Sequence, residues 1–257
     1  MKKNISVIKE IALVAVLILA LFLIFVPMPA SLINKLLLVN IGFSLFLFVT
    51  RFLGNTRLTF LFPKLVQYFC FFTCGLAIST TRIFLTVPTI EENVPVVVAV
   101  SRWICRENYV SGFLTTLMVF VVLVIYCKWY VNRNLETAAR FSLEGLPREL
   151  SEIERKLIIR EISEDEAAKL KKEVQKKSSF FGEMDGSAKF LFGTISVIMS
   201  LFLVAAGGGI TMGILHLGLG WKEVLEQYVI LSSGYLVLFI VPLLLTSLGF
   251  KICNEES

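Results

Sequence analysis

A chain of 257 residues is long enough for one or two soluble domains, but its composition excludes an ordinary soluble surface. Hydrophobic residues make up 56% of the chain, 22 residues are Phe, and the mean hydropathy is +0.79. Several stretches of about 18 residues carry almost no charge, which is close to the length that a helix needs to cross ~30 Å of hydrocarbon. The net charge of +5 lies mostly beside these stretches, which favours anionic lipid headgroups over nucleic acid. The sequence therefore predicts a multi-pass membrane protein that binds no nucleic acid.

Six apolar stretches predict membrane-spanning helices. In chain order they are Ile11–Val26, Leu36–Phe52, Leu65–Leu85, Tyr109–Cys127, Phe190–Leu215 and Tyr228–Phe250. The first also resembles a secretory signal peptide, because a basic start precedes it. Its length and the spans that follow favour a transmembrane helix.

Three local features modify this pattern. The apolar run Val96–Val100, between the third and fourth spans, is expected to dip into the membrane interface. Gly207–Gly209 would permit close helix packing in the fifth span, as small residues do in membranes. Gly234 and Pro242 are expected to interrupt the sixth span.

A polar island from Lys128 to Lys189 separates the fourth span from the fifth. It holds 13 of the 25 Lys and Arg residues and 12 of the 20 Asp and Glu residues. We therefore expect three parts: transmembrane helices one to four in residues 1–127, a helical loop in 128–189, and helices five and six with a short tail in 190–257. The predicted fold class is all-α, a polytopic membrane protein with about six transmembrane helices and a helical cytoplasmic insertion between the fourth and fifth.

The distribution of Lys and Arg predicts the orientation. With the N-terminus inside, 20 of these residues lie on the cytoplasmic side and 4 on the other, while Arg82 lies within a span. Cytoplasmic segments of membrane proteins carry the excess of Lys and Arg. Both termini and the island are therefore predicted to be cytoplasmic.

The island reads as helical. Ser151–Glu154 and Ser163–Glu166 both match the capping box, in which side chains satisfy the free amides at the start of a helix. Apolar residues recur at helical spacing after each, and Glu173 with Lys177 forms a favourable i,i+4 pair. These residues alone predict a solvated helical hairpin and no specific activity.

Nothing in the residue pattern predicts an enzyme or a cofactor. The chain has one His, and Cys70 and Cys74 lie four residues apart without further metal ligands near them in sequence. The five cysteines are expected to be buried thiols rather than disulfides. No nucleophile and base set or phosphate-binding loop is recognisable, and Glu164–Glu166 reads as a solvated helix start.

Several ordered blocks resemble one protein family. Ala139–Pro147 reads Ala-Arg-Phe-Ser-Leu-Glu-Gly-Leu-Pro and resembles the signature of the FHIPEP family, approximately Ala-Arg-Phe-Thr-Leu-Asp-Ala-Met-Pro. Gly182–Phe190 is similar to the family's Gly-x-Met-Asp-Gly-Ala-Ser-Lys-Phe, and Asn108–Gly112 to its Asn-Tyr-Val-Val-Gly. Phe62–Pro63 with Ser79–Arg82 matches the spacing of two further family pieces. The resemblance covers nearly the whole chain.

The FHIPEP family is the large export-gate subunit of flagellar and virulence type III secretion systems. The resemblance implies a component of the bacterial cytoplasmic (inner) membrane that forms a homo-oligomeric ring in the lipid bilayer. It further implies contacts with other export-apparatus membrane subunits and with secreted protein substrates. The island would form a cytoplasmic collar, and transport would be coupled to the proton gradient.

The resemblance selects eight candidate functional residues: Arg82, Glu136, Arg140, Phe141, Pro147, Asp185, Gly186 and Lys189. Arg82 lies 18 residues beyond Lys64, roughly 27 Å along a helix, so it either snorkels to the far headgroups or meets a neighbouring helix or pore. Glu136 and Arg140 have the spacing of a helical ion pair. For Asp185, a turn or helix-cap role competes with a gating role.

Departures from the family lie mostly in the spans. Where the family carries Arg and Asn in the third span and Asp in the sixth, this chain has Thr73, Ala77 and Tyr235. Intramembrane ionisable groups usually serve a path for ions, protons or substrate. Family members are also expected to continue into two more spans and a large cytoplasmic domain. These departures leave an alternative open, a truncated or divergent family remnant with a regulatory or assembly role that lacks proton coupling and substrate docking.

Overall fold

The computed structural model describes the backbone of residues 2–52, 56–86, 93–105, 108–216, 218 and 220–255, with most of their side chains. Throughout this part of the chain the structure is helical and contains no strand. The elements are α1 (Lys2–Phe25), α2 (Ala30–Phe52), α3 (Thr56–Thr86), α4 (Pro95–Cys105), α5 (Tyr109–Arg140), the π-helical turn η1 (Phe141–Gly145), α6 (Leu146–Ile158), α7 (Glu164–Leu215) and α8 (Trp221–Glu255). The predicted all-α fold class is confirmed.

Five of these helices are long and apolar enough to cross a membrane: α2, α3, α5, α7 and α8. They correspond to the second through sixth predicted spans. The first predicted span lies in α1, whose side chains are described from Val14 onward; the described part, Val14 to Phe25, is apolar. The apolar run expected to dip into the interface is part of α4, a short helix that packs against α8.

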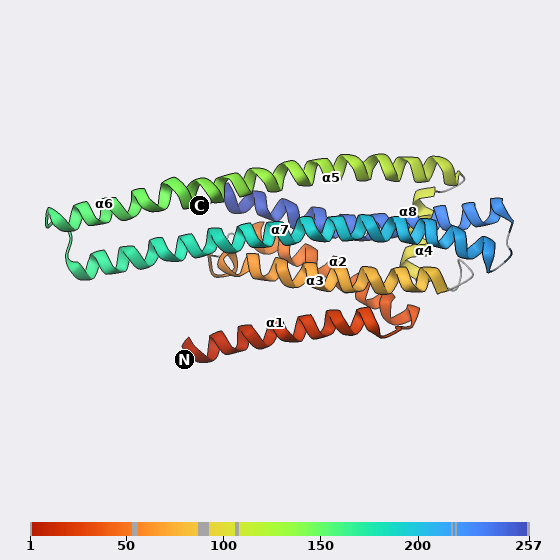
Figure 1. Cartoon of the computed structure of the whole chain (residues 1–257), viewed down its shortest axis with the longest axis horizontal. Coiled ribbons are helices and arrows are strands. Elements are labelled where there is room, and N and C mark those ends of the chain that lie inside the picture. The colour runs from red at the N-terminus through yellow and green to blue at the C-terminus, as the bar shows by residue number, and fades with distance from the viewer. Residues whose placement is uncertain are drawn as a thin grey trace.

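The spanning helices form a bundle, and α6 with the first half of α7 extends beyond it as a helical hairpin (Figure 1). We call this side of the molecule the hairpin end. The start of α1 and the end of α8 point toward the same end (Figure 1). α7 has 52 residues, about 78 Å of helix, so it runs without a break from the hairpin through the bundle. α5 and α7 therefore each cross one of the boundaries drawn between the predicted parts.

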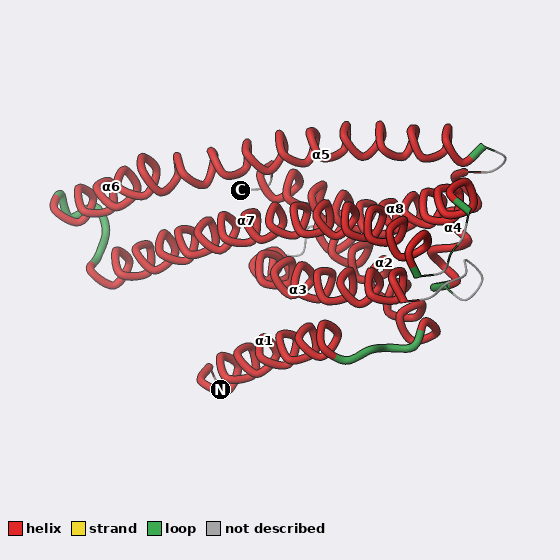
Figure 2. The backbone as a smooth tube through the Cα atoms, turned by 45° about the vertical axis from the view of Figure 1, so that its right-hand side comes forward, coloured by secondary structure: helices red, strands yellow, loops and turns green. Residues whose placement is uncertain are grey.

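The position of α1 differs from that of the other long helices. Among the described residues, α1 packs against α3 alone, whereas α2, α3, α5 and α7 all contact α8. In the rotated view α1 lies to one side of the remaining helices (Figure 2). The bundle core is therefore built by the other long helices, with α8 near its centre.

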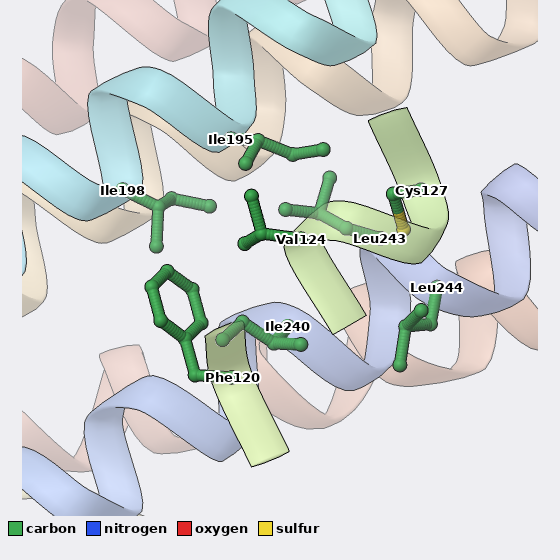
Figure 3. A pocket seen from close by; sticks show the side chains of 8 residues that line it. All are labelled: Phe120, Val124, Cys127, Ile195, Ile198, Ile240, Leu243 and Leu244. Carbon is green, nitrogen blue, oxygen red and sulfur yellow. The ribbon is translucent and has the colours of Figure 1, made fainter. Parts of the chain in front are cut away.

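The core is closely packed with aliphatic and aromatic side chains. Phe69, Phe84 and Phe239 are fully buried, and Tyr235 lies between the last two. Apolar side chains of α5, α7 and α8 surround a cavity of about 10 Å³, with Cys127 the one sulfur-bearing residue in its wall (Figure 3). A water molecule would find almost no polar partners there, so the cavity is expected to be dry.

Glycines mark the closest helix contacts. A Cβ atom at Gly209 would overlap the ring of Tyr228, and one at Gly208 would lie 3.0 Å from Leu85. The predicted role of this glycine run in close packing is thus confirmed for these two positions. At Gly234 a Cβ atom would overlap the Val97 carbonyl oxygen, so α4 can sit directly on α8 there.

One prediction about α8 is wrong. Gly234 and Pro242 do not interrupt the sixth span, because α8 continues through both as one helix. Membrane bundles tolerate such residues, since neighbouring groups satisfy the backbone that a Pro leaves unpaired.

The hairpin has its own small core. Ile153, Ala167 and Val174 are buried there, separately from the bundle core. Ser163 caps α7 as predicted: its hydroxyl accepts from the Glu166 amide at 3.3 Å, and the Glu166 carboxylate accepts from the Ser163 amide at 2.9 Å.

Two predictions within the hairpin are wrong. Ser151 lies inside α6 rather than at its start, because that helix already begins at Leu146 with Pro147 in its first turn. Lys177 pairs across the hairpin with Glu149, at 3.7 Å, instead of pairing with Glu173 along α7. A second cross-hairpin pair joins Lys171 and Glu154 at 3.0 Å.

Candidate functional site at the base of the hairpin

Four phenylalanines connect three elements where the hairpin meets the bundle. The ring of Phe60 in α3 lies 5.3 Å from that of Phe180 in α7, and Phe180 lies 5.9 Å from Phe181. Phe181 in turn lies 4.4 Å from Phe141 in η1. Such edge and tilted contacts stabilise aromatic pairs beyond the area they bury. We call Phe60, Phe141, Phe180 and Phe181 the aromatic junction.

The π-helical turn places Phe141 in this junction. The Leu146 amide donates to the Phe141 carbonyl, five residues back instead of four. One extra residue in a helical turn shifts all following side chains around the axis, and such turns occur often at functional sites. The family-like run Ala139–Pro147 therefore folds as the link that sets the direction of α6 relative to α5.

Two ion pairs border the junction on its membrane side. Lys64 of α3 bonds Glu183 of α7 at 2.9 Å, and Lys189 bonds Asp185 along α7 at 2.6 Å. All four side chains are partly exposed, so each pair contributes little to the free energy of unfolding. These ion pairs hold charged groups in place at the level where the apolar stretches of α3 and α7 begin.

Five of the predicted site residues lie near this base, and two do not interact as expected. Phe141 packs in the junction. Asp185, Gly186 and Lys189 lie on α7, within three turns after the junction residue Phe181. A Cβ atom at Gly186 would lie 3.6 Å from the Gln67 amide of α3, so α3 and α7 run close together here. Pro147 is exposed in the first turn of α6.

Glu136 and Arg140 do not form the predicted ion pair. Both side chains are described and both are exposed on α5, but no bond joins them. Solvated i,i+4 pairs are worth only tenths of a kcal/mol, so solvent readily replaces such a contact. Arg140 directly precedes η1. Its exposed side chain faces water at the entrance to the hairpin.

Arg82 lies at the opposite end of the bundle and binds α1. Its guanidinium donates to the carbonyls of Ile24 at 2.6 Å and Phe25 at 3.2 Å. These carbonyls belong to the last turn of α1, where no intrahelical donor remains. Of the two alternatives for Arg82, the structure supports the neighbouring-helix partner over snorkelling.

Two neutral hydrogen bonds join helices inside the bundle. Thr73 donates to Asn40 at 2.9 Å, and Thr81 bonds the Tyr235 hydroxyl at 3.2 Å. All four residues are at least 96% buried. Thr73 and Tyr235 occupy two of the positions where the sequence departs from the charged residues of the family pattern.

The base of the hairpin offers mechanical and electrostatic features rather than reactive groups. No set of three His, Cys, Asp or Glu residues within the described ranges is close enough to hold a metal ion. In the hairpin, a hydrogen bond from Lys156 and its charge lower the pKa of Glu152. Cys70, Cys105 and Cys127 are buried free thiols, as predicted, whereas the free thiol Cys74 is only partly buried; the side chain of Cys253 lies outside the described residues.

Sequence reasoning missed five residues of this region: Phe60, Lys64, Phe180, Phe181 and Glu183. A signal was present, because two adjacent phenylalanines inside a charged segment need an apolar neighbour. Their partners could not be identified from the sequence, since the contacts depend on α3 and α7 running parallel in one register.

Comparison with known proteins agrees with the blocks read from the sequence. The profile of the FHIPEP family matches residues 20–253. The chain is 29% identical to the Secretion system apparatus protein SsaV of Salmonella typhimurium, over 94% of this chain and 35% of that protein. It is 30% identical to the Flagellar biosynthesis protein FlhA of Borreliella burgdorferi and 28% identical to the Low calcium response locus protein D of Yersinia pestis. These two matches cover 90% and 93% of this chain and 34% of each relative.

The chain thus spans about a third of the length of the curated relatives that it matches. No solved structure matches it. A family profile that extends over more than nine-tenths of a multi-pass, all-helical chain accounts for its signature, its spans and its hairpin together. The chain belongs to the FHIPEP family.

Proposed function

We propose that this chain is a membrane component of a type III, flagellar-type protein export apparatus in the bacterial inner membrane. It forms part of the export gate, with the hairpin and both termini in the cytoplasm. One observation carries this proposal: the family signature folds as the π-helical link of the aromatic junction, between a membrane bundle and a projecting hairpin.

The proposed assembly is a homo-oligomeric ring that also contacts other membrane subunits of the apparatus. Relatives are named as secretion apparatus and flagellar biosynthesis proteins, which supports such partners. The hairpins of neighbouring copies would form a collar through which secreted protein substrates pass. In this arrangement the aromatic junction holds each hairpin at a fixed angle to its bundle.

The test compares Phe141→Ala with Leu143→Ala. Phe141 contacts Phe181, whereas Leu143 lies in the same turn with 77% of its surface exposed, so it is a matched control. Each variant is expressed in a strain that lacks the native gene. Secreted substrate is measured by immunoblot, and the mass of the purified protein is measured in a gentle detergent.

We expect Phe141→Ala to reduce secretion severalfold while the membrane level and the oligomer mass stay unchanged. Leu143→Ala should behave like the unaltered protein. Equal secretion by both variants would remove the junction from the mechanism, and purified protein that is only monomeric would contradict the ring.

A second candidate function is an assembly or regulatory role without proton coupling. The observation in its favour is that neutral side chains occupy two positions where the family pattern is charged: Thr73 bonds Asn40, and Tyr235 bonds Thr81. Protons move through membranes along ionisable groups, and these pairs contain none that titrates near neutral pH. A deletion strain that loses all secretion, with no second full-length family member in the cell, would contradict this role.

A further inference from the structure

An apolar hollow of about 590 Å³ lies between α3 and α7, on the membrane side of the aromatic junction. Phe71 of α3 and Phe190 of α7 form part of its wall, with their ring centroids 5.1 Å apart. Gly193 and Val197 continue the α7 wall, and a Cβ atom at Gly193 would meet nothing within 4 Å. Phe190, Gly193 and Val197 are all exposed, so the hollow opens away from the bundle core. We call it the seam hollow.

The seam hollow lies at the level where α7 enters the membrane. Lys189 lines its outer end, and α7 carries no charge from Phe190 to its last residue, Leu215. This uncharged stretch is long enough to cross the hydrocarbon, which we expect to begin near Lys189. Along the helix axis, Gly193 lies about 6 Å and Val197 about 12 Å farther in than Lys189. A lipid whose phosphate lies beside Lys189 therefore reaches both positions with the first half of an acyl chain.

The outer end of the seam hollow carries two opposite charges. The Lys189 ammonium bonds the carboxylate of Asp185, one turn farther out on α7, at 2.6 Å. The side chains of Lys189 and Asp185 remain 68% and 37% exposed, so a ligand can reach both groups. Because the two charges offset each other, a ligand with one negative charge gains little net attraction here. A ligand that carries a phosphate and an ammonium group can instead pair with both.

An amide from α3 adds a second donor at this end. The Gln67 amide nitrogen would lie 3.6 Å from a Cβ atom at Gly186, and Gly186 itself lines the hollow. Gln67 is half-buried and makes no hydrogen bond to any residue that the structure describes. A partly buried amide gains from an acceptor, and a phosphate oxygen is a strong one.

We propose that the seam hollow binds one phosphatidylethanolamine molecule. Its phosphate accepts from Lys189 and Gln67, its ammonium donates to Asp185, and one acyl chain lies along Gly193 and Val197. In this lipid the phosphate is attached to the glycerol and the ammonium lies beyond it, which matches the order of Lys189 and Asp185 along α7. The site is independent of the export role, because it depends only on the α3–α7 seam and on the membrane.

Native mass spectrometry of the full chain in a mild detergent tests the site. Phosphatidylethanolamine, phosphatidylcholine and phosphatidylglycerol with the same acyl chains are added separately. We expect one phosphatidylethanolamine per chain to be retained about tenfold better than phosphatidylcholine, because a trimethylated ammonium cannot donate a hydrogen bond to Asp185. Phosphatidylglycerol should also be retained less well, since it offers Asp185 no cation. Gly193→Leu should abolish the preference by filling the hollow.

Asp185→Asn provides the sharper measurement. Without the carboxylate, Lys189 keeps a positive charge that nothing on its own turn of α7 offsets. The preference should then reverse, with phosphatidylglycerol retained better than phosphatidylethanolamine. A purely structural role of Asp185 would weaken the retention of all three lipids without changing their order.

Matched controls exist for both changes. Gly207→Leu also enters open space on α7 but lies outside the seam hollow, and Asp165→Asn removes a carboxylate from the exposed start of α7. Both controls should keep the preference for phosphatidylethanolamine.

Three outcomes would overturn the proposal. The first is equal retention of phosphatidylethanolamine and phosphatidylcholine by the unaltered protein. The second is an unchanged lipid order in Asp185→Asn, or equal effects of Gly193→Leu and Gly207→Leu. The third is a co-purifying membrane protein that Gly193→Leu releases while lipid retention stays the same, which would assign the hollow to a helix of that protein.

Discussion

Single residues attach α1 to the rest of the molecule. Besides its apolar contacts with α3, α1 is held by the two bonds from Arg82 to the Ile24 and Phe25 carbonyls. A cation at the C-terminal end of a helix also interacts favourably with the helix dipole. The end of α1 is therefore expected to depend on this one side chain.

We predict that Arg82→Ala loosens the last turn of α1 and lowers the free energy of unfolding by roughly 1–2 kcal/mol. Faster hydrogen exchange at the end of α1, with unchanged exchange in α8, would measure it. Arg102→Ala is the control, because Arg102 is exposed on α4. Unchanged exchange in α1 would mean that apolar packing on α3 alone holds this helix.

Gly234 sets the distance between α4 and α8. A Cβ atom there would overlap the Ser101 hydroxyl and the Val97 carbonyl, and Ser101 itself is fully buried. We expect Gly234→Ala to lower the melting temperature in detergent, at a cost of about 1–3 kcal/mol from overpacking. Gly182→Ala, where nothing lies within 4 Å, should be neutral or slightly stabilising. Equal melting of the two variants would show that α4 can move away from α8 freely.

Among the elements, we expect the hairpin to open independently of the bundle. Its core of Ile153, Ala167 and Val174 is separate from the bundle core, and its two cross-hairpin ion pairs are solvated. Three buried side chains contribute only a few kcal/mol to the free energy of opening the hairpin, whereas the bundle buries dozens of residues. Local opening of the hairpin should therefore precede any loss of the bundle.

We predict that Ile153→Ala raises hydrogen exchange throughout α6 by about thirtyfold or more, because truncating a buried Ile costs about 2–5 kcal/mol. Exchange in α2 and α8 should not change. Glu154→Gln removes the ion pair to Lys171 and should have an effect several times smaller, since solvated pairs contribute little. Slower or equal exchange in Ile153→Ala would show that contacts outside the hairpin hold it.

The sequence predicted the elements well where a local pattern determines them. Hydropathy located the five described spans, and the Ser163–Glu166 spacing located the start of α7, because burial in lipid and helix capping both act over short stretches. The junction was not predictable in the same way. The π-helical turn at Phe141 and the contact between Phe60 and Phe180 depend on how α3, α5 and α7 are placed in three dimensions. The predicted break at Pro242 was wrong for a related reason: packing in the bundle, and not the residue alone, determines whether α8 continues.

For the whole molecule, the distribution of charge and the arrangement of the helices predict the same orientation in the membrane. The start of α1, the end of α8 and the hairpin lie at the same end, while α4 and the start of α8 lie at the other (Figure 1). The hairpin end carries most Lys and Arg residues, and the opposite end includes only a few, among them Arg102 and Lys222. The positive-inside rule then predicts a cytoplasmic hairpin end.

Cysteine labelling in cells tests this orientation. Glu161→Cys lies in the exposed hairpin loop and Lys222→Cys in the exposed first turn of α8, and Cys253→Ser removes the native thiol near the C-terminus. A maleimide that cannot cross membranes should label Lys222→Cys in intact spheroplasts, and Glu161→Cys only after lysis, because twenty Lys and Arg residues hold the hairpin end inside. The buried thiols Cys70, Cys105 and Cys127 should stay unlabelled in both samples. Labelling of Glu161→Cys in intact spheroplasts would reverse the orientation and, with it, exclude a cytoplasmic collar, since the hairpin could not then meet substrate before it enters the membrane.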